Sequence, residues 1–108
     1  MTTPSMVIVT GSVTARPDTV DEVEALCLAH VHRSRTEPGC LLHSVHRDVE
    51  NDRRFVFVEH WSSLADLHVH FAVPESGELI GLLRDLTEDM SPIEIYEVVS
   101  PTPSTSRA

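Results

Sequence analysis

Three residues with useful chemistry, Glu59, Trp61 and His70, lie in one stretch where the sequence pattern changes from strand to helix. The alternation of apolar residues places Phe57, Glu59 and Trp61 on the same face of the predicted strand. An indole N–H can donate a hydrogen bond to a developing oxyanion, and a neutral imidazole can accept a proton, because the unperturbed pKa of histidine is ~6.5. The strand end therefore predicts a small-molecule site in which Trp61 and His70 act on the substrate.

Each of these residues also has a purely structural interpretation. Trp61 is either a donor in the pocket or a large aromatic side chain that closes the core. His70 is either a base or substrate anchor, or a cap for the last helical carbonyl groups. For Glu59 the sequence favours a buried or rim carboxylate, paired with a neighbour, over a catalytic role.

Two further histidines are candidates for the lining of the same pocket. His43 lies in a predicted strand and is either a pocket residue or a surface or interface histidine. His30 lies on the apolar side of the first predicted helix, where it either faces the pocket from above or is a partly buried core histidine. We expect His43, Glu59, Phe57 and His30 to form the substrate-binding set.

The spacing of the seven histidines does not predict a metal site. His68 and His70 are two positions apart on a predicted helix and point to different sides, so they cannot chelate one ion together. His43 and His46 lie on opposite faces of a predicted strand. We expect a site without metal and without any other cofactor.

Composition predicts a single folded, acidic domain. Hydrophobic residues form 41% and charged residues 23% of the 108 residues, which is ordinary for a globular protein with one core. The formal net charge of -9 and the lack of any lysine leave no basic face for nucleic acid or anionic membrane. Cys27 and Cys40 have neither metal-motif spacing nor a disulfide-rich context, so we predict free, mostly buried thiols. The N-terminal apolar run is too short for a signal peptide or a membrane span, which predicts a cytoplasmic protein.

Strand and helix signals follow one another in the order βαββαβ. The predicted strands cover residues 6–15, 40–48, 54–61 and 93–99, with a hairpin turn at 50–52 and a polar loop at 87–91. The first predicted helix is capped by Asp18 or Thr19 and runs to the break at 37–39; a second is capped by Ser62 or Ser63, and Pro74 opens a further helical stretch. Residues 1–5 and 100–108 are rich in Ser, Thr and Pro and are predicted to be disordered, which leaves one domain at 6–99.

This order predicts an α+β domain of ferredoxin-like topology, in which right-handed crossovers give a four-stranded antiparallel sheet with helices on one face. The other face of such a sheet is bare. An apolar bare face needs a partner, and the simplest partner is a second copy packed sheet to sheet about a two-fold axis. We therefore expect an obligate homodimer.

An ordered set of short motifs resembles the antibiotic biosynthesis monooxygenase (ABM) domain family over roughly residues 6–99. The motifs are Pro17 after the first strand, Glu37-Pro38-Gly39-Cys40 before the second, Phe55-Val56-Phe57-Val58-Glu59-x-Trp61 in the third, and Ala65-x-x-x-x-His70 in the next helix. The resemblance implies a dimeric α/β barrel with a pocket between sheet and helices in each protomer. Members include cofactor-independent monooxygenases of anthrones and quinols, haem-degrading monooxygenases, and an isomerase-type enzyme acting on a phosphorylated signal molecule.

The resemblance to the haem-degrading branch is incomplete. That branch implies an Asn in the first strand, a Trp at the end of the third strand and a ligand His in the later helical region. Trp61 matches, but Gly11 occupies the position aligned with the Asn, and residues 73–89 contain no histidine. Haem degradation is therefore not expected.

The cofactor-free branch gives the leading hypothesis, a homodimeric monooxygenase that oxidises a small aromatic or polyketide-like phenol, anthrone or quinol with molecular oxygen. Such chemistry needs a bound electron-rich phenol or enol, removal of a proton, and stabilisation of the anion while it passes an electron to oxygen. Trp61 and His70 are the predicted catalytic residues. The Asn, Tyr and Arg that accompany the Trp in anthrone-oxidising members have no securely aligned counterpart here.

Two alternatives from other functional classes stay open. A non-oxidative isomerase or lyase of a small polar metabolite requires cationic groups for phosphate in the pocket, and a non-catalytic small-molecule-binding dimer is expected to have a small or filled cavity. An open cavity between Trp61 and His70 distinguishes both enzymes from the binding dimer. The cationic candidates are Arg33, Arg35, Arg47, Arg53, Arg54 and Arg84.

Overall fold

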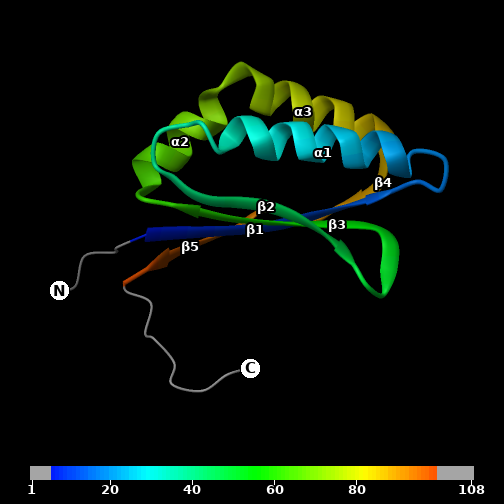
Figure 1. Ribbon diagram of the computed structural model, residues 1–108, viewed down its shortest axis with the longest axis horizontal. Coiled ribbons are helices and arrows are strands. Elements are labelled where there is room, and N and C mark those ends of the chain that lie inside the picture. The colour runs from blue at the N-terminus through cyan, green and yellow to red at the C-terminus, as the bar shows by residue number, and fades with distance from the viewer. Residues whose placement is uncertain (1–5, 100–108) are drawn as a thin grey trace.

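The computed structural model describes residues 6–99, which form an α+β domain of ferredoxin-like topology (Figure 1). The predicted fold class is confirmed. The segments predicted to be disordered, 1–5 and 100–108, lie outside the described residues. The elements are β1 (Met6–Ala15), α1 (Val20–Ser34), β2 (Cys40–Asp48), β3 (Asn51–Trp61), α2 (Leu64–Ala72), α3 (Pro74–Leu86), β4 (Thr87–Met90) and β5 (Glu94–Val98).

The sheet is antiparallel throughout, with the order β2-β3-β1-β4 and with β5 also paired to β1. The last two strands share the outer edge of β1, with Met90 opposite Val13 and Ile95 opposite Val9. The predicted loop at 87–91 is therefore wrong for its first four residues, which form the short strand β4. Pro92 has no N–H to donate to the ladder, which explains why the edge strand is divided into two.

Two side-chain caps were predicted for helix starts, and the structure contains one of the two capping hydrogen bonds. Ser63 caps α2 as predicted, because its Oγ accepts a hydrogen bond from the backbone N–H of Asp66 at 3.1 Å. Thr19 precedes α1 but makes no such bond, and its hydroxyl donates instead to the carbonyl oxygen of Leu86 at 2.6 Å. Thr19 therefore ties the start of α1 to the end of α3.

Loop boundaries differ from the sequence-based ranges by a few residues. Helix α1 ends at Ser34, before the predicted break at 37–39, and β3 already begins at Asn51 within the predicted turn. The loop before β2 turns at Gly39, which has a φ of +81°, a backbone conformation that favours glycine.

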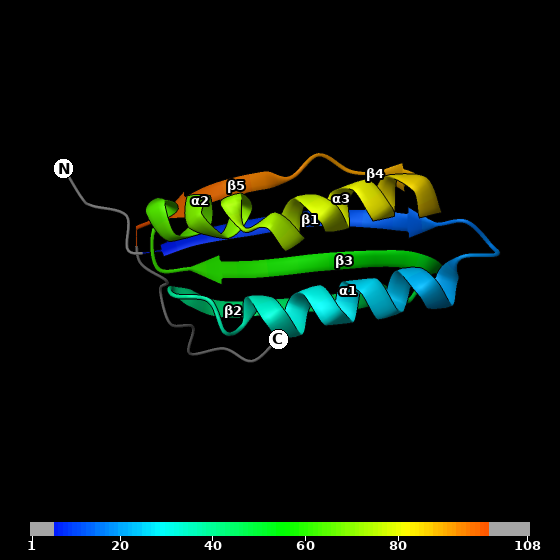
Figure 2. The same cartoon turned by 90° about the horizontal axis from the view of Figure 1, so that it is seen from above.

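The three helices form one layer over one face of the sheet (Figure 1). Seen from above, α1 runs along the β2 side, whereas α2 and α3 run along the side of β1, β4 and β5 (Figure 2). Two buried apolar clusters fill the space between the layers. One consists of Val13, Ala15, Val23, Cys27, Phe55, Leu79 and Leu83, and the other of Val7, Val9, Trp61 and Leu67.

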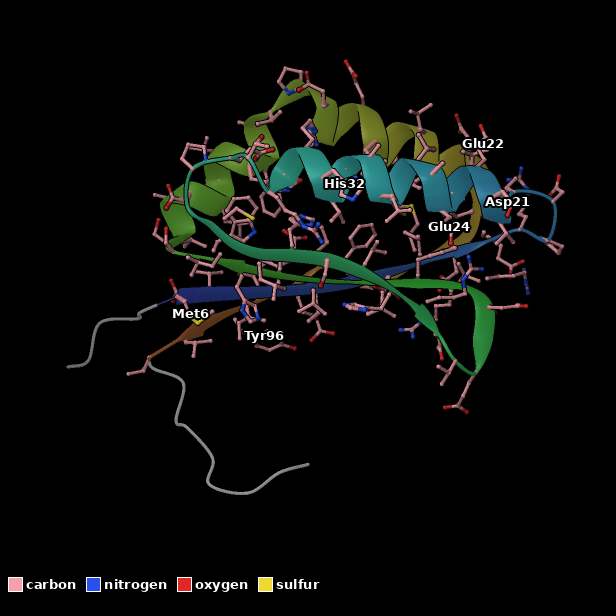
Figure 3. All side chains as sticks on the ribbon, in the orientation of Figure 1. Met6, Asp21, Glu22, Glu24, His32 and Tyr96 are labelled. Atoms are coloured by element: carbon pink, nitrogen blue, oxygen red, sulfur yellow. The ribbon has the colours of Figure 1, made fainter. Side chains whose placement is uncertain are left out.

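Within residues 6–99, no helix covers the opposite face of the sheet (Figure 1). Because side chains alternate along a strand, Val56 and Val58 of β3 point to this bare face while Phe57 points toward the helices. Tyr96 of β5 also lies on the bare side and is exposed (Figure 3). The homodimer expected to cover this face stays a prediction.

Two smaller predictions concern membranes and thiols. In the described part of the chain, none of the helices is both long and apolar enough to cross a membrane. Cys27 is buried and Cys40 is half-buried, and both are free thiols, as predicted. Burial raises the pKa of the Cys27 thiol to about 12, so this side chain is protonated at neutral pH.

Candidate functional site

A cavity of about 410 Å³ lies between the helix-covered face of the sheet and the helices α2 and α3. Strands β1 and β3 form its floor, and the connection between β4 and β5 lines it at the sheet edge. Its ionisable groups, His30, Glu59 and His70, gather at one place, since the two histidine rings lie 5.3 Å apart. Most of the other wall is apolar and includes Val9, Val13, Leu79, Ile80, Leu83 and Met90.

His70 lies in the last turn of α2, and its ring is almost fully buried. Its Nδ1 is 2.7 Å from Oε1 of Glu37, in the loop before β2. An ionised carboxylate only accepts hydrogen bonds, so Nδ1 donates to Glu37, and in the neutral form of the ring the lone pair is on Nε2. The carbonyl oxygen of His70 is satisfied separately by the hydroxyl of Ser76 at 2.9 Å. The ring is therefore free to act at the cavity through Nε2.

His30 lies in α1 and faces the cavity from the other side. Its Nδ1 is 2.6 Å from Nη2 of Arg33, one helical turn later. A guanidinium group only donates, so Nδ1 is the acceptor and the ring proton of the neutral imidazole is on Nε2. Burial, followed by the charges that His43, His70 and Arg33 can carry, lowers the pKa of His30 to about 3. His30 is therefore neutral at physiological pH.

Glu59 lies at the centre of the polar end of the site. The indole N–H of Trp61 donates to its Oε1 at 2.9 Å, and Nε2 of His43 approaches the same oxygen to 3.3 Å. Nε2 of His70 is 3.9 Å from this oxygen. Burial favours a higher pKa for Glu59, but the close approach and charge of His43, the N–H of Trp61 and the charge that His70 can carry together lower the pKa below its usual value. Glu59 is a buried carboxylate that remains ionised.

Trp61 and His43 lie directly behind this polar end. Both side chains are almost fully buried, and neither is among the described residues that line the cavity. The ring of Trp61 lies 4.6 Å from that of His70, and the ring of His43 lies 5.5 Å from it, both measured between ring centroids. The two side chains contact the lining residues rather than the cavity.

Residues 6–80 match the sequence model of a protein family described as antibiotic biosynthesis monooxygenase. The chain belongs to the ABM family. A Deinococcus radiodurans protein, named as a candidate antibiotic biosynthesis monooxygenase, is 29% identical to it; their structures agree with a TM-score of 0.87 over 93% of this chain and 99% of that one. A similarly named protein from Nitrosomonas europaea is 16% identical and shares the fold, with a TM-score of 0.84 over 95% of this chain and 99% of its own.

A longer relative of this ABM protein occurs in Synechocystis. That uncharacterized protein is 34% identical over 92 residues, which make up 85% of this chain and 63% of the relative. The chain therefore spans less than two thirds of the length of this relative.

The fold distributes the predicted site residues of the ABM protein between two layers. Phe57, like the ionisable residues described above, lines the cavity, and its ring lies 6.3 Å from that of His30. Trp61 gives its N–H to Glu59 and not to the cavity, which separates it from the direct role expected of it. The lining layer thus contains His30, Phe57, Glu59 and His70, and the layer behind it contains His43 and Trp61.

The polar partners of the two lining histidines were not among the predicted site residues. Glu37 belongs to the Glu37-Pro38-Gly39-Cys40 motif that was used for the family resemblance, but its contact with His70 spans 33 residues of sequence. Arg33 follows His30 by one helical turn, a spacing at which helical side chains meet. The spacing of Arg33 and His30 was therefore visible in the sequence, whereas the contact between Glu37 and His70 depends on the fold.

The tertiary structure also brings together three histidines that are distant in sequence. His30, His43 and His70 each offer a ring nitrogen, and these three atoms lie within 4.8 Å of one another. Spacing along the sequence relates only histidines that lie close together in it, such as His43 and His46. The cluster is therefore a feature that periodicity within single elements could not reveal.

Proposed function

We propose that the protein is a homodimeric, cofactor-independent monooxygenase that oxidises a small electron-rich phenol, anthrone or quinol with molecular oxygen. The observation that carries this proposal is the placement of His30, Glu59 and His70 at one end of an otherwise apolar cavity. A flat aromatic substrate is largely apolar and has one acidic hydroxyl or enol group. Such a molecule matches a cavity that is apolar except at one end.

His70 is the proposed general base. Its Nδ1–H is held by Glu37 at 2.7 Å, so the Nε2 lone pair is available for the substrate proton. Proton transfer creates an imidazolium cation 3.9 Å from Oε1 of Glu59. The carboxylate of Glu59 stabilises that cation, which lowers the free-energy cost of forming the substrate anion.

His30 is the proposed partner of the substrate anion. Because Arg33 occupies Nδ1, the neutral ring presents Nε2–H as a donor. Trp61 acts through Glu59, since its N–H holds Oε1 in place at 2.9 Å. In this proposal Trp61 is a positioning residue and His70 is the catalytic base.

The reaction balances without any external reductant. For an anthrone, His70 removes one proton from the acidic CH₂ or its enol, and the resulting carbanion passes one electron to O₂. The carbon radical and superoxide combine, the peroxide takes the proton back from His70, and loss of water leaves a C=O group. The net change is R₂CH₂ + O₂ → R₂C=O + H₂O, in which the substrate supplies all of the electrons.

The positions of the arginines favour this chemistry over an isomerase that acts on a phosphorylated metabolite. Within residues 6–99, the cavity is lined by none of the arginines that could hold a phosphate group. Arg35 donates to the carbonyl oxygen of His43 at 2.9 Å, and Arg33 contacts His30. Other arginines pair with carboxylates away from the cavity, as in Arg47 with Glu24, Arg53 with Glu88 and Arg54 with Asp48.

A non-catalytic binding protein is the remaining alternative. The rings of Trp61 and His70 are in contact, so the open space lies beside His70 and not between the two residues. A cavity of about 410 Å³ supports small-molecule binding in either case. Only turnover distinguishes an enzyme from a binding protein.

The homodimer is proposed from the bare face of the sheet. The alternation along β3 directs Val56 and Val58 to the side opposite the helices. The exposed Tyr96 of β5 lies on the same side (Figure 3). Packing two such faces together removes this surface from water.

Oxygen uptake with a panel of anthrones and quinols, using chelator-treated protein, tests the oxidation. His70→Gln is expected to lower kcat by roughly 100-fold or more, because it removes the base while keeping a side chain of similar length. His68→Gln is the matched control, since His68 is an exposed neighbour on the same helix. Uptake no faster than in buffer with every substrate, or equal rates in the two variants, would refute the proposal.

A further inference from the structure

The rings of His30, His43 and His70 form a nearly equilateral triangle. Their centroids are 5.2 Å apart for His30 and His43, 5.3 Å for His30 and His70, and 5.5 Å for His43 and His70. The three residues come from α1, β2 and α2. Because each residue is held by a different element, the triangle is a product of the fold.

His43 supplies a second and independent observation. Its side chain is 1% exposed, yet neither ring nitrogen has a hydrogen-bond partner among the described residues. Oε1 of Glu59 lies 3.3 Å from Nε2, without the geometry of a hydrogen bond. A buried imidazole nitrogen without a partner is unfavourable, because it has lost its contacts with water. A ligand that takes up this nitrogen removes the penalty.

We propose that His30, His43 and His70 bind one divalent first-row transition metal ion, such as Zn²⁺ or Co²⁺, next to the carboxylate of Glu59. Imidazole nitrogen is a preferred ligand for these ions. Three nitrogens within 4.8 Å of one another leave an ion at their centre about 2.8 Å or less from each. Each ring must then move by at most about 0.7 Å to reach the usual metal–nitrogen distance of about 2.1 Å.

The residues around the triangle suit a cation. Glu59 lines the cavity close to two of the rings, and its negative charge offsets part of the charge of the ion. Glu37 accepts from Nδ1–H of His70, which leaves Nε2 of that ring as the ligand atom. A carboxylate behind a metal-binding histidine is a common arrangement, because it fixes the tautomer and orients the ring.

Arg33 is the one neighbour that opposes metal binding. Its Nη2 donates to Nδ1 of His30, so the proton of that ring is on Nε2. Binding through Nε2 requires this contact to break, and Glu75 is an alternative partner for Arg33, with its Oε2 at 3.6 Å from Nη1. Replacing Arg33 by glutamine, whose side-chain oxygen accepts from Nδ1–H, is therefore expected to strengthen metal binding.

The proposed metal site does not rest on the proposed oxidation, although a bound ion would occupy the Nε2 lone pair of His70 that the oxidation uses. The two can be separated experimentally, because oxygen uptake is measured on chelator-treated protein and metal binding is measured without substrate. If oxygen uptake is not observed, the metal-binding result still stands, and the reverse is also true.

Titration of the full chain with Co²⁺ tests the site, after removal of any polyhistidine tag and of the chelator. We expect one Co²⁺ per chain, with the visible absorption of a four-coordinate nitrogen site, and its displacement by one equivalent of Zn²⁺. His30→Gln and His43→Gln are each expected to weaken binding by at least about 100-fold, since even changes in residues behind the ligands cost 10–100-fold. Arg33→Gln is expected to strengthen it about tenfold, and His68→Gln is the matched control.

Far-UV circular dichroism establishes that each variant is folded. If His43→Gln does not fold, the half-buried His30 and the ligand-sparing Arg33→Gln variant still test the site. The proposal is overturned if Co²⁺ does not bind with a stoichiometry of one, or if His30→Gln binds it as tightly as His68→Gln does.

Discussion

The hydrogen bond from Trp61 to Glu59 leads to a quantitative prediction for Trp61→Phe. Trp61 is 0% exposed, and its Nε1–H is 2.9 Å from an ionised, buried carboxylate oxygen. Hydrogen bonds to charged groups contribute about 1.5–3 kcal/mol. The smaller ring also leaves a void, which we expect to cost about 1–2 kcal/mol on the scale of large-to-small core substitutions. We therefore expect Trp61→Phe to lower the free energy of unfolding by about 2.5–5 kcal/mol.

A second background separates the hydrogen bond from the packing. In Glu59→Gln the amide oxygen still accepts from the indole, but the bond is between neutral groups and is worth about 0.5–1.5 kcal/mol. The void left by phenylalanine is the same in both backgrounds. Trp61→Phe should therefore cost about 1–1.5 kcal/mol less in the Glu59→Gln protein.

The assay is urea unfolding of the four proteins, followed by circular dichroism because two of them lack tryptophan. Protein concentration must be equal and metal absent, since a dimer or a bound ion changes the apparent stability. If Trp61→Phe costs the same in both backgrounds, within the ~0.5 kcal/mol limit of additivity, the charge on Glu59 does not strengthen the contact. That result would refute the role of Trp61 as the residue that holds the carboxylate.

Three further predictions concern the backbone, a buried thiol and the bare face of the sheet. Gly39→Ala should destabilise the fold by about 2 kcal/mol or more in urea unfolding, because Gly39 has a φ of +81° and an added Cβ would lie 2.6 Å from Cβ of Asp66. The control Gly81→Ala, in the open part of α3, should be neutral or stabilising. The pKa of Cys27 is about 12 in the folded protein against 9.0 for an ordinary thiol, so between these values only the unfolded chain ionises, and the stability is unaffected below pH 9 and falls above it. Cys27→Ala should flatten this fall when unfolding is measured from pH 8 to 11. Val58→Arg should convert a dimer into a monomer in analytical ultracentrifugation, and an unchanged mass would place the dimer interface elsewhere.

Most of the fold was predictable because it depends on local patterns. Continuous β-branched residues gave β1 at its observed bounds of Met6–Ala15, and alternation in β3 placed Phe57 and Glu59 on one common face. The missed strand β4 has the sequence Thr-Glu-Asp-Met, which has no apolar alternation. Its pairing with β1 comes from its position beside that strand rather than from its own composition.

The candidate site was only partly predictable, for a related reason. Glu59, Trp61 and His70 lie within one short stretch of the sequence, so this stretch alone was enough to propose them as site residues. The direction of the indole N–H could not be predicted, because a strand pattern fixes the face on which a side chain lies and not its hydrogen-bond partner. The structure gives that N–H to Glu59.

The sequence by itself determined which residues share a face of each strand and that histidine, carboxylate and indole groups occur together near one strand end. Only the tertiary structure decided that Glu37 holds His70 and that His30 and His43 complete a triangle with it. The physical reason is that periodicity records burial within one element, whereas contacts between distant residues depend on how the elements pack together. The chemistry of this site therefore depends on packing among α1, β2, β3 and α2 that none of these segments specifies alone.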